Sequence, residues 1–544
     1  MPHDSAQPTS GSHTLVDPDL GRIDVRTLPL PDSWRQPWGT YSSTGTVLVA
    51  YRTVDDPDEP GWLNLSVVED DGTDPRHVYA GPAPLRPRHN GMRLLPFADG
   101  TRVLLSDYVL ECDPSVDRCE TATLVPLVYP DLVEHDPAVL HRWSEPIIAP
   151  DGEHIAWTTL HAAVGAYNVL GRLRREEDRY VVDEPRLVSD TWALVDDPDH
   201  PGDVRPATVR GGEVKQFARG GAAISLAGTA GRALVDSVLQ DLGGEGLTPL
   251  TLTPGYDETT ILSPDETVGI VMTTRFSPRT SCSVIGLLPR PLAGLSANGL
   301  AMAAYLYSVA GVRSFRPGNI GPALVDLARA TTDDGYLGAD LSDPAGEWVY
   351  LSPMSWHPSS RSVAWNETLR VAHGGADEQT RIRLATLLDR APATPVAAVP
   401  TPEDAPYSRP LTAEAIAPTA QPLGGRVRGA VAGHAEVVRT GGAGLGAAVT
   451  VETRYAGYSD DGLTFLDGTE HLTVSAGTAS SAYRADLVRR GADPGEMRLR
   501  VTFTQADRNA PVRLSFAPAD DGLPASHGFT TYRGTTLHVA DMSE

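Results

Sequence analysis

The segments SEPIIAPDGEHIAW at 144–157 and DETTILSPDETVGIVM at 257–272 share one pattern. Each has a polar lead-in, a short apolar strand, a Pro-Asp turn and a second strand that is rich in apolar residues. Proline presets the φ angle of such a turn, and aspartate accepts hydrogen bonds from the backbone of the turn. The pattern therefore predicts a β-hairpin in each segment.

Four more segments carry weaker copies of this hairpin. They are WGTYSSTGTVLVAY at 38–51, GMRLLPFADGTRVLLS at 91–106, GEVKQFARGGAAISLAG at 212–228 and LSPMSWHPSSRSVAW at 351–365. The spacing between copies leaves room for four short strands in each unit, and such a repeat is typical of a β-propeller. We therefore predict an all-β fold built on a six-bladed, TolB-like β-propeller.

Composition along the chain suggests the domain boundaries. We expect an N-terminal tail at 1–30, the propeller at 31–389, a Pro/Ala-rich linker at 390–423 and a small β-sandwich at 424–544. The linker is expected to be extended because of its proline content. An Ala/Leu/Met-rich segment near 290–315 predicts a helical insertion in the propeller. Insertions of this kind usually lie on one face, where they cover a binding site.

Charge and hydropathy exclude several classes of function. The formal net charge is -25, which disfavours binding to a phosphate backbone, so no nucleic-acid partner is expected. No run of about 18 apolar residues is present, so no membrane span is expected. The first ten residues lack the basic and apolar regions of a secretory signal. We expect a cytoplasmic protein, or a secreted one if a signal was removed; the sequence leaves the oligomeric state open.

The three cysteines and the histidines are not arranged as a metal site. No Cys-x-x-Cys pair occurs, and the histidines do not cluster at ligand spacing, so we expect no metal and no cofactor. Cys112 and Cys119 enclose a short acidic loop. They are predicted either to form a local disulfide or, in a reducing compartment, to remain thiols.

Aligning the six turns predicts where a site lies. The first strand of each blade lines the central channel of a propeller, so residues five or six positions before each turn meet at one mouth. Those positions hold Arg93, Glu145, Glu213 and Glu258, with Asp257 beside the last. Carboxylates with pKa values pushed apart are what glycoside hydrolysis requires, so the three glutamates are the predicted catalytic residues. The alternatives are that they accept backbone hydrogen bonds between blades, or that they bind a cation such as calcium.

Further polar residues are candidates for binding substrate, each with a structural role as the alternative. Arg313 and Arg316 lie beside the insertion and suit an anionic substrate. The other candidates are Arg275 after a strand, His161 and Tyr167 in a loop of the third blade, and His357 in the sixth turn.

The chain resembles the saponin hydrolases of filamentous fungi, which are secreted glycosidases. The resemblance rests on LPFADGTRVLLSDYVLECD at 95–113, the two strong hairpins, SFRP at 314–317, RVRGAVAGHAEV at 426–437 and YAGYSDDGLTFLDGTEHLTV at 455–474. The sixth turn departs from the usual Ser-Pro-Asp-Gly. The resemblance implies cleavage of a glucuronide bond in a triterpenoid saponin, without implying a catalytic pair.

We therefore expect a glycoside hydrolase whose partner is a small-molecule glycoside. The arginines would hold an acidic sugar, and the insertion would contact the aglycone. The enzymatic alternatives are a lyase or another propeller glycosidase that acts on uronic-acid sugars. The non-enzymatic alternative is a TolB-like propeller that binds a protein or glycan.

Overall fold

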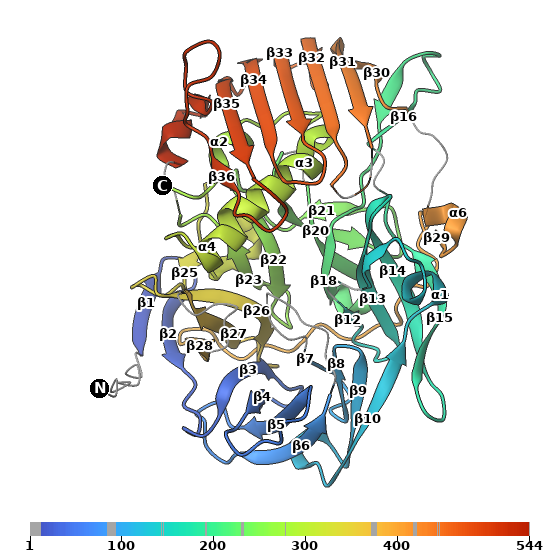
Figure 1. The fold of residues 1–544 in the computed structure, drawn as a ribbon, viewed down its shortest axis with the longest axis vertical. Coiled ribbons are helices and arrows are strands. Elements are labelled where there is room, and N and C mark those ends of the chain that lie inside the picture. The colour runs from blue at the N-terminus through green and yellow to red at the C-terminus, as the bar shows by residue number, and fades with distance from the viewer. Residues whose placement is uncertain are drawn as a thin grey trace.

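The computed structural model describes residues 12–83, 94–142, 144, 146–190, 193–229, 233–277, 279–333, 335–370, 378–416, 422–442, 444 and 446–542. Figure 1 shows three layers: a β-propeller, helices above it, and a long C-terminal sheet above the helices. The first strands of neighbouring blades contact one another in the order β12, β18, β22, β26, β3, β7 around the centre. The all-β fold with a six-bladed propeller is therefore confirmed.

The first three blades come from the N-terminal third of the chain. Blade 1 contains β3 (Arg35–Tyr41), β4 (Val47–Arg52), β5 (Trp62–Val68) and β6 (Arg76–Pro82). Blade 2 contains β7 (Leu94–Pro96), β8 (Arg102–Leu105), β9 (Tyr108–Asp113) and β10 (Thr121–Val128). Blade 3 contains β11 (Val139–His141), β12 (Ile147–Ile148), β13 (His154–His161), β14 (Gly165–Arg175) and β15 (Tyr180–Leu187). β10 pairs in parallel with β15, so blades 2 and 3 share one sheet.

The other three blades follow in order. Blade 4 contains β18 (Glu213–Ala218), β19 (Ala223–Gly228), β20 (Asp236–Asp241) and β21 (Leu247–Pro249). Blade 5 contains β22 (Asp257–Leu262), β23 (Val268–Thr273), β24 (Ala323–Asp326) and β25 (Ala339–Asp340). Blade 6 contains β26 (Trp348–Trp356), β27 (Ser362–Leu369), β28 (Thr380–Leu387), β2 (Gly21–Thr27) and β1 (His13–Asp17).

The N-terminal segment closes the ring of blades. The expected tail at 1–30 contains β1 and β2, and β2 pairs antiparallel with β28, Val25 opposite Ala385. Pairing the start of the chain with the last blade removes an open sheet edge, which explains why this segment is a strand rather than a tail.

The Pro-Asp turn of blade 3 forms as its chemistry predicts, whereas Asp265 in the turn of blade 5 accepts from the hydroxyls of Ser263 and Thr267. In blade 3, Asp151 accepts hydrogen bonds from the backbone N–H groups of Glu153 at 2.8 Å and His154 at 3.1 Å. Gly152 has a φ of 70°, which suits glycine in the left-handed region. These turns all lie at the far end of the first strands from Glu213 and Glu258.

The Pro/Ala-rich segment after β28 is an ordered strap across these turns. Backbone N–H groups of 393, 396 and 399 donate in succession to carbonyls of Ser359, Pro264 and Gly220, in blades 6, 5 and 4. The N–H of Thr401 then donates to Asp151 in blade 3 at 3.1 Å. Farther along, β29 (Arg409–Pro410) pairs with β15. The strap is extended, as expected for its composition, and it is held to the turns by hydrogen bonds.

One contact between strap and propeller responds to pH. The Nδ1 of His154 lies 2.7 Å from Asp151, and its Nε2 lies 3.0 Å from Glu403 of the strap. Burial alone would lower the pKa of His154, but its hydrogen bonds to these carboxylates outweigh burial and raise the pKa.

Stability should therefore fall as the pH rises past neutrality. A group whose pKa is raised by folding stabilises the protein fully below its unfolded pKa, about 6.5 for histidine, and loses that contribution as the pH rises through the folded pKa. We expect His154→Gln to flatten the fall in melting temperature as the pH rises above about 6.5. The control is His434→Gln, which changes a ring that is only partly buried. An unchanged pH profile in His154→Gln would show that the contact contributes nothing.

The C-terminal strands form one sheet instead of the expected β-sandwich. Its strands are β30 (Gly425–Arg428), β31 (Ala432–Gly441), β32 (Val449–Ser459), β33 (Thr464–Val474), β34 (Ser481–Gly491), β35 (Gly495–Thr504), β36 (Arg513–Leu514), β37 (His527–Tyr532) and β38 (Thr535–His538). The hairpin of β16 (Leu194–Asp196) and β17 (Val204–Pro206), which leaves the propeller between blades 3 and 4, extends the sheet through β30.

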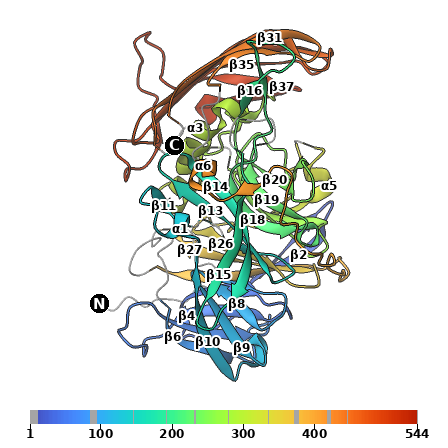
Figure 2. The same ribbon diagram turned by 90° about the vertical axis from the view of Figure 1, so that its right-hand side faces the viewer.

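Helices take the place of a second sheet. The helices that contact the C-terminal strands are α2 (Ser283–Gly286) and α3 (Gly294–Ala304), and a π-helical turn (Tyr305–Ala310) joins α3 to α4 (Gly311–Ser314). The short helices α1 (Asp131–Glu134), α5 (Leu327–Ala330) and α6 (Ala413–Ile416) lie elsewhere in the chain. Strand β34 alternates buried and exposed residues, and its buried side faces α3. Figure 2 shows the sheet as a layer over α3, with the propeller below.

The insertion and the sheet are in close contact. A Cβ atom on Gly299 of α3 would lie 2.7 Å from the side chain of Val474, so glycine permits the close approach. An apolar face that already packs on helices needs no second sheet, which explains the absence of a sandwich among the described strands. No helix in the described part of the chain has the length and apolar character to cross a membrane.

The cysteines of the described chain are free thiols. Cys112 lies in β9 and is buried, and Cys119 is partly buried nearby. Burial and the neighbouring Cys119 raise the pKa of the Cys112 thiol. Of the two predicted alternatives, the structure has the thiols.

Candidate functional site

Two of the three predicted glutamates meet at one mouth of the channel. Glu213 is the first residue of β18, and Glu258 is the second residue of β22. The two strands are the first strands of adjacent blades and contact each other. The register of the repeated turns thus places both carboxylates at the same level of the channel.

Lys215 joins these two carboxylates. Its Nζ lies 2.8 Å from Oε2 of Glu213 and 3.1 Å from Oε1 of Glu258. The exposed fraction of the side chain is 2% for Lys215, 10% for Glu258 and 29% for Glu213. The ammonium therefore forms the floor of the cluster, and Glu213 is its most accessible member.

Glu213 and Glu258 have different surroundings. The hydroxyl of Ser144, which lies just before β12 of blade 3, donates to Oε1 of Glu213. On Glu258, Oε2 accepts a hydrogen bond from the Tyr256 hydroxyl at 3.3 Å. Burial raises the pKa of Glu258; the Lys215 charge opposes this rise, and the Glu213 charge adds to it. Glu258 is thus the carboxyl that is more readily protonated than an ordinary glutamate.

The helical insertion supplies the roof of the cluster. The ring of Tyr305, at the end of α3, lies 6.3 Å from that of Tyr256. Burial raises the pKa of Tyr305, and the negative charge of Glu258 adds to it. Arg313 of α4 is buried, and its charge lowers the pKa of Glu258. The insertion therefore covers the mouth at which the carboxylates lie.

Arg313 retains hydrogen-bonding capacity. Its Nε donates to the carbonyl of Tyr350 at 3.2 Å, which is the only hydrogen bond of its guanidinium among the described residues. Its two terminal nitrogens make no hydrogen bond within the described part of the chain. A planar guanidinium with two free amino groups suits a carboxylate, which it binds through two parallel hydrogen bonds.

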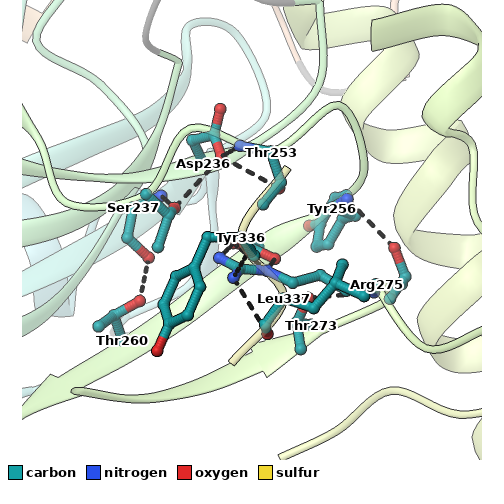
Figure 3. Close-up of polar contacts among 12 residues, drawn as sticks. Asp236, Ser237, Thr253, Tyr256, Thr260, Thr273, Arg275, Tyr336 and Leu337 are labelled. Atoms are coloured by element: carbon teal, nitrogen blue, oxygen red, sulfur yellow. Dashed lines mark hydrogen bonds and ion pairs between the residues drawn. The ribbon is translucent and has the colours of Figure 1, made fainter. Parts of the chain in front are cut away.

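Polar contacts below the roof hold β22 in place, as Figure 3 shows. The backbone N–H of Tyr256 donates to Thr274 Oγ1 at 3.1 Å. The Thr260 hydroxyl donates to that of Ser237 at 2.7 Å. These bonds connect β22 with its neighbours and fix the backbone on either side of Glu258.

Asp257 and Arg275, both predicted to bind substrate, form a buried ion pair. Nε of Arg275 lies 3.2 Å from Oδ2 of Asp257, and Nη1 donates to the Tyr336 carbonyl at 2.9 Å (Figure 3). Both side chains are almost fully buried. The pair connects β22 with the loop before β25. All three guanidinium nitrogens of Arg275 donate hydrogen bonds to groups of the protein.

Four other predicted residues make structural contacts. His161 is buried beside Asp136, with Nε2 and Oδ2 3.3 Å apart, and Tyr167 packs in the core of blade 3. Arg316 donates to the carbonyl of Val512 at 2.7 Å and stacks on Tyr307, so it joins the insertion to the C-terminal sheet. His357 follows the end of β26, at the opposite end of the first strands from Glu258.

Glu145 and Arg93 lie outside the described residues, so their roles stay predictions. Lys215 was not among the predicted residues, although the sequence carries a signal for it: it is the only lysine in the chain. Within the described part of the chain, no group of three or more His, Cys, Asp or Glu side chains is arranged to hold a metal ion.

No family profile and no curated protein sequence matches this chain. Among solved structures it is similar to TolB from Acinetobacter baumannii, with 11% identity, a TM-score of 0.29 and coverage of 66% of this chain and 64% of that chain. It is also similar to a TolB-type protein from Agrobacterium tumefaciens, with 14% identity, a TM-score of 0.31 and coverage of 62% and 94%. A puromycin hydrolase shares 12% identity, with a TM-score of 0.29 and coverage of 83% and 57%.

These neighbours include TolB-like β-propeller proteins. The strand order described above defines the class of this chain independently: it is a six-bladed β-propeller closed by its N-terminal strand.

Proposed function

We propose that the chain is a glycoside hydrolase that cleaves an acidic sugar, such as a glucuronide, from an apolar aglycone. The observation that carries this proposal is the cluster of Glu213, Lys215 and Glu258 at a roofed channel mouth. One carboxyl there has a raised pKa, and the other is more accessible, which is the division of roles that glycoside hydrolysis needs. The resemblance to saponin hydrolases supplies the substrate class.

The spacing of the carboxylates supports a retaining reaction. Both contact the same nitrogen at about 3 Å, so the facing oxygens are at most about 6 Å apart. Retaining glycosidases have carboxylates about 5–5.5 Å apart, whereas inverting enzymes need about 6.5–9.5 Å. Protonated Glu258 would donate its proton to the glycosidic oxygen while the bond from that oxygen to C1 breaks. Glu213 would attack C1, and a water molecule deprotonated by Glu258 would then release the sugar.

Arg313 supports the choice of an acidic sugar. Its free amino groups, close enough to Glu258 to affect the pKa of that carboxyl, suit the carboxylate of a uronic acid. An uncharged sugar would leave these donors without a charged partner, which weakens binding.

The test is to incubate the protein with a triterpenoid saponin glucuronide, an aryl β-glucuronide and the matching aryl β-glucoside. We expect release of aglycone from both glucuronides, little from the glucoside, and a first sugar product of retained configuration by NMR. Arg313→Met should lower kcat/KM for the glucuronide more than for the glucoside. An unsaturated uronate product would indicate a lyase, and calorimetric binding without turnover would indicate a binding propeller; either result would overturn the proposal.

A further inference from the structure

Lys215 stands apart from every other basic residue of the chain. Lysine and arginine together number 45, and all except Lys215 are arginine. A chain with such a preference for arginine has its one lysine between two carboxylates in the channel. An ammonium is a compact point charge, whereas a guanidinium is a wider planar group, so the two are not equivalent in a confined site.

The position of Lys215 links two blades. Lys215 and Glu213 belong to β18, and Glu258 belongs to β22 of the next blade. Next to this pair, the N–H of Val214 donates to Thr158 Oγ1 of blade 3 at 3.0 Å. The ammonium nitrogen therefore fixes the separation of two carboxylates from different blades. The backbone of β18 next to it is hydrogen-bonded to blade 3.

A buried ammonium with two carboxylates favours an unequal distribution of protons. One carboxylate has to be ionised to balance the ammonium in a dry site. Glu213 suits that role because the Ser144 hydroxyl also donates to it and because it is the more exposed of the two. Among the described residues, Glu258 is surrounded by Lys215, Glu213, Tyr256, Tyr305 and Arg313, which include the charged groups with the largest effects on its pKa.

We infer that Lys215 is a positioning residue that keeps Glu213 ionised and sets its distance from Glu258, so that the two carboxylates take different roles. This inference rests on the proposed function for its catalytic meaning. Lys215 acts on the reaction through the two glutamates and need not touch the substrate. Its ammonium also limits the rise in the pKa of Glu258, so the lysine sets the upper pH limit at which that carboxyl is still an acid.

The kinetic test uses Lys215→Met and Lys215→Arg. We expect Lys215→Met to lower kcat by roughly 100-fold, the scale for a displaced catalytic group. Its remaining activity should extend to higher pH than that of the wild type, since the charge that lowers the pKa of Glu258 is gone. Lys215→Arg should return the upper pH limit to that of the wild type, even where the wider guanidinium reduces kcat. Full activity of Lys215→Met with an unchanged pH profile would overturn the inference.

A second measurement does not depend on activity. Because the chain has one lysine, protein grown with lysine labelled with 13C at Cε gives one Cε resonance. We expect this resonance to shift as Glu258 titrates, and the shift to disappear in Glu258→Gln but to persist in Glu266→Gln. If the pH-dependent shift of the Cε resonance is the same in Glu258→Gln as in the wild type, the inference is overturned, even for an active enzyme. If the Cε resonance depends on Glu258 but the protein has no glycosidase activity, the result supports the ion pairs of Lys215 and rejects only the proposed function.

Discussion

Glu258→Gln is expected to lower kcat on the saponin glucuronide by roughly 10²- to 10⁴-fold, the range for loss of a general acid. Glutamine keeps the shape of the side chain and removes the transferable proton. The loss should be much smaller for an aryl glucuronide with an acidic phenol as its aglycone, because that leaving group departs without protonation. The measurement is kcat of Glu258→Gln and of the wild type on both substrates. A loss confined to the saponin glucuronide would identify Glu258 as the general acid.

Glu213→Gln should behave differently, because a nucleophile is needed whichever aglycone departs. We expect large losses on both substrates. The matched control is Glu266→Gln in the turn of blade 5: burial raises the pKa of Glu266 as well, but it lies at the other end of β22 and its side chain accepts from the N–H of Arg219. Equal, small losses in all three variants would place the chemistry elsewhere.

The wild-type pH profile follows from the same geometry. The acid must be protonated, so activity should decline as the pH rises through the pKa of Glu258, which burial raises above that of an ordinary glutamate. Glu266→Gln should leave that decline in place, since Glu266 is not the acid.

The propeller could be predicted because its information is local. A proline, an aspartate and the strands on either side fix each hairpin, and the hairpins fix the register that brings Glu213 and Glu258 together. The sequence did not predict that β2 closes the ring of blades, because β2 pairs with β28, which lies about 360 positions later in the chain. Nothing in the residues near 21–27 encodes that partner.

The substrate-binding candidates were harder to assign for a related reason. An arginine near a channel has the same local sequence whether it binds a ligand or a protein group. Arg316 bonds to the carbonyl of Val512, 196 residues away, and Arg275 is used by Asp257 and two carbonyls. Arg313, by contrast, keeps both terminal nitrogens without a hydrogen bond among the described residues. Lys215 could have been singled out from composition, because it is the only lysine in the chain.

Glu470→Gln is expected to destabilise the roof of the site, by about 3–5 kcal/mol for loss of one partner of a buried ion pair. Nε of Arg290, in the segment before α3, lies 2.8 Å from Oε2 of Glu470 in β33, and both side chains are fully buried. Tyr455 and Tyr483 also donate to Glu470, at 3.0 and 2.8 Å. Arginine stays protonated at any ordinary pH, so the variant leaves a buried positive charge without its counter-charge. Urea unfolding measures the loss.

Two matched variants separate charge from packing in this result. The exposed pair of Arg172 and Glu153 is the control, and Glu153→Gln should stay within about 0.5 kcal/mol of the wild type. Replacing both buried partners, Arg290→Met with Glu470→Leu, should recover part of the stability: no charge is left uncompensated, but the hydroxyls of Tyr455 and Tyr483 lose their acceptor. A Glu470→Gln variant as stable as the wild type would mean that the pair contributes no net stability.

The same variant tests how the roof acts on the chemistry. Arg290 also donates to the carbonyls of Ile285 and Leu288, so it orders the segment that leads into α3 and thus positions Tyr305 and Arg313. Hydrogen exchange in Glu470→Gln should therefore increase through 283–314, and kcat on the glucuronide should fall, while the pH limit set by Glu258 and Lys215 stays in place. If exchange increases there and kcat does not change, the roof is not needed to hold the acidic sugar, and recognition rests on the channel residues alone.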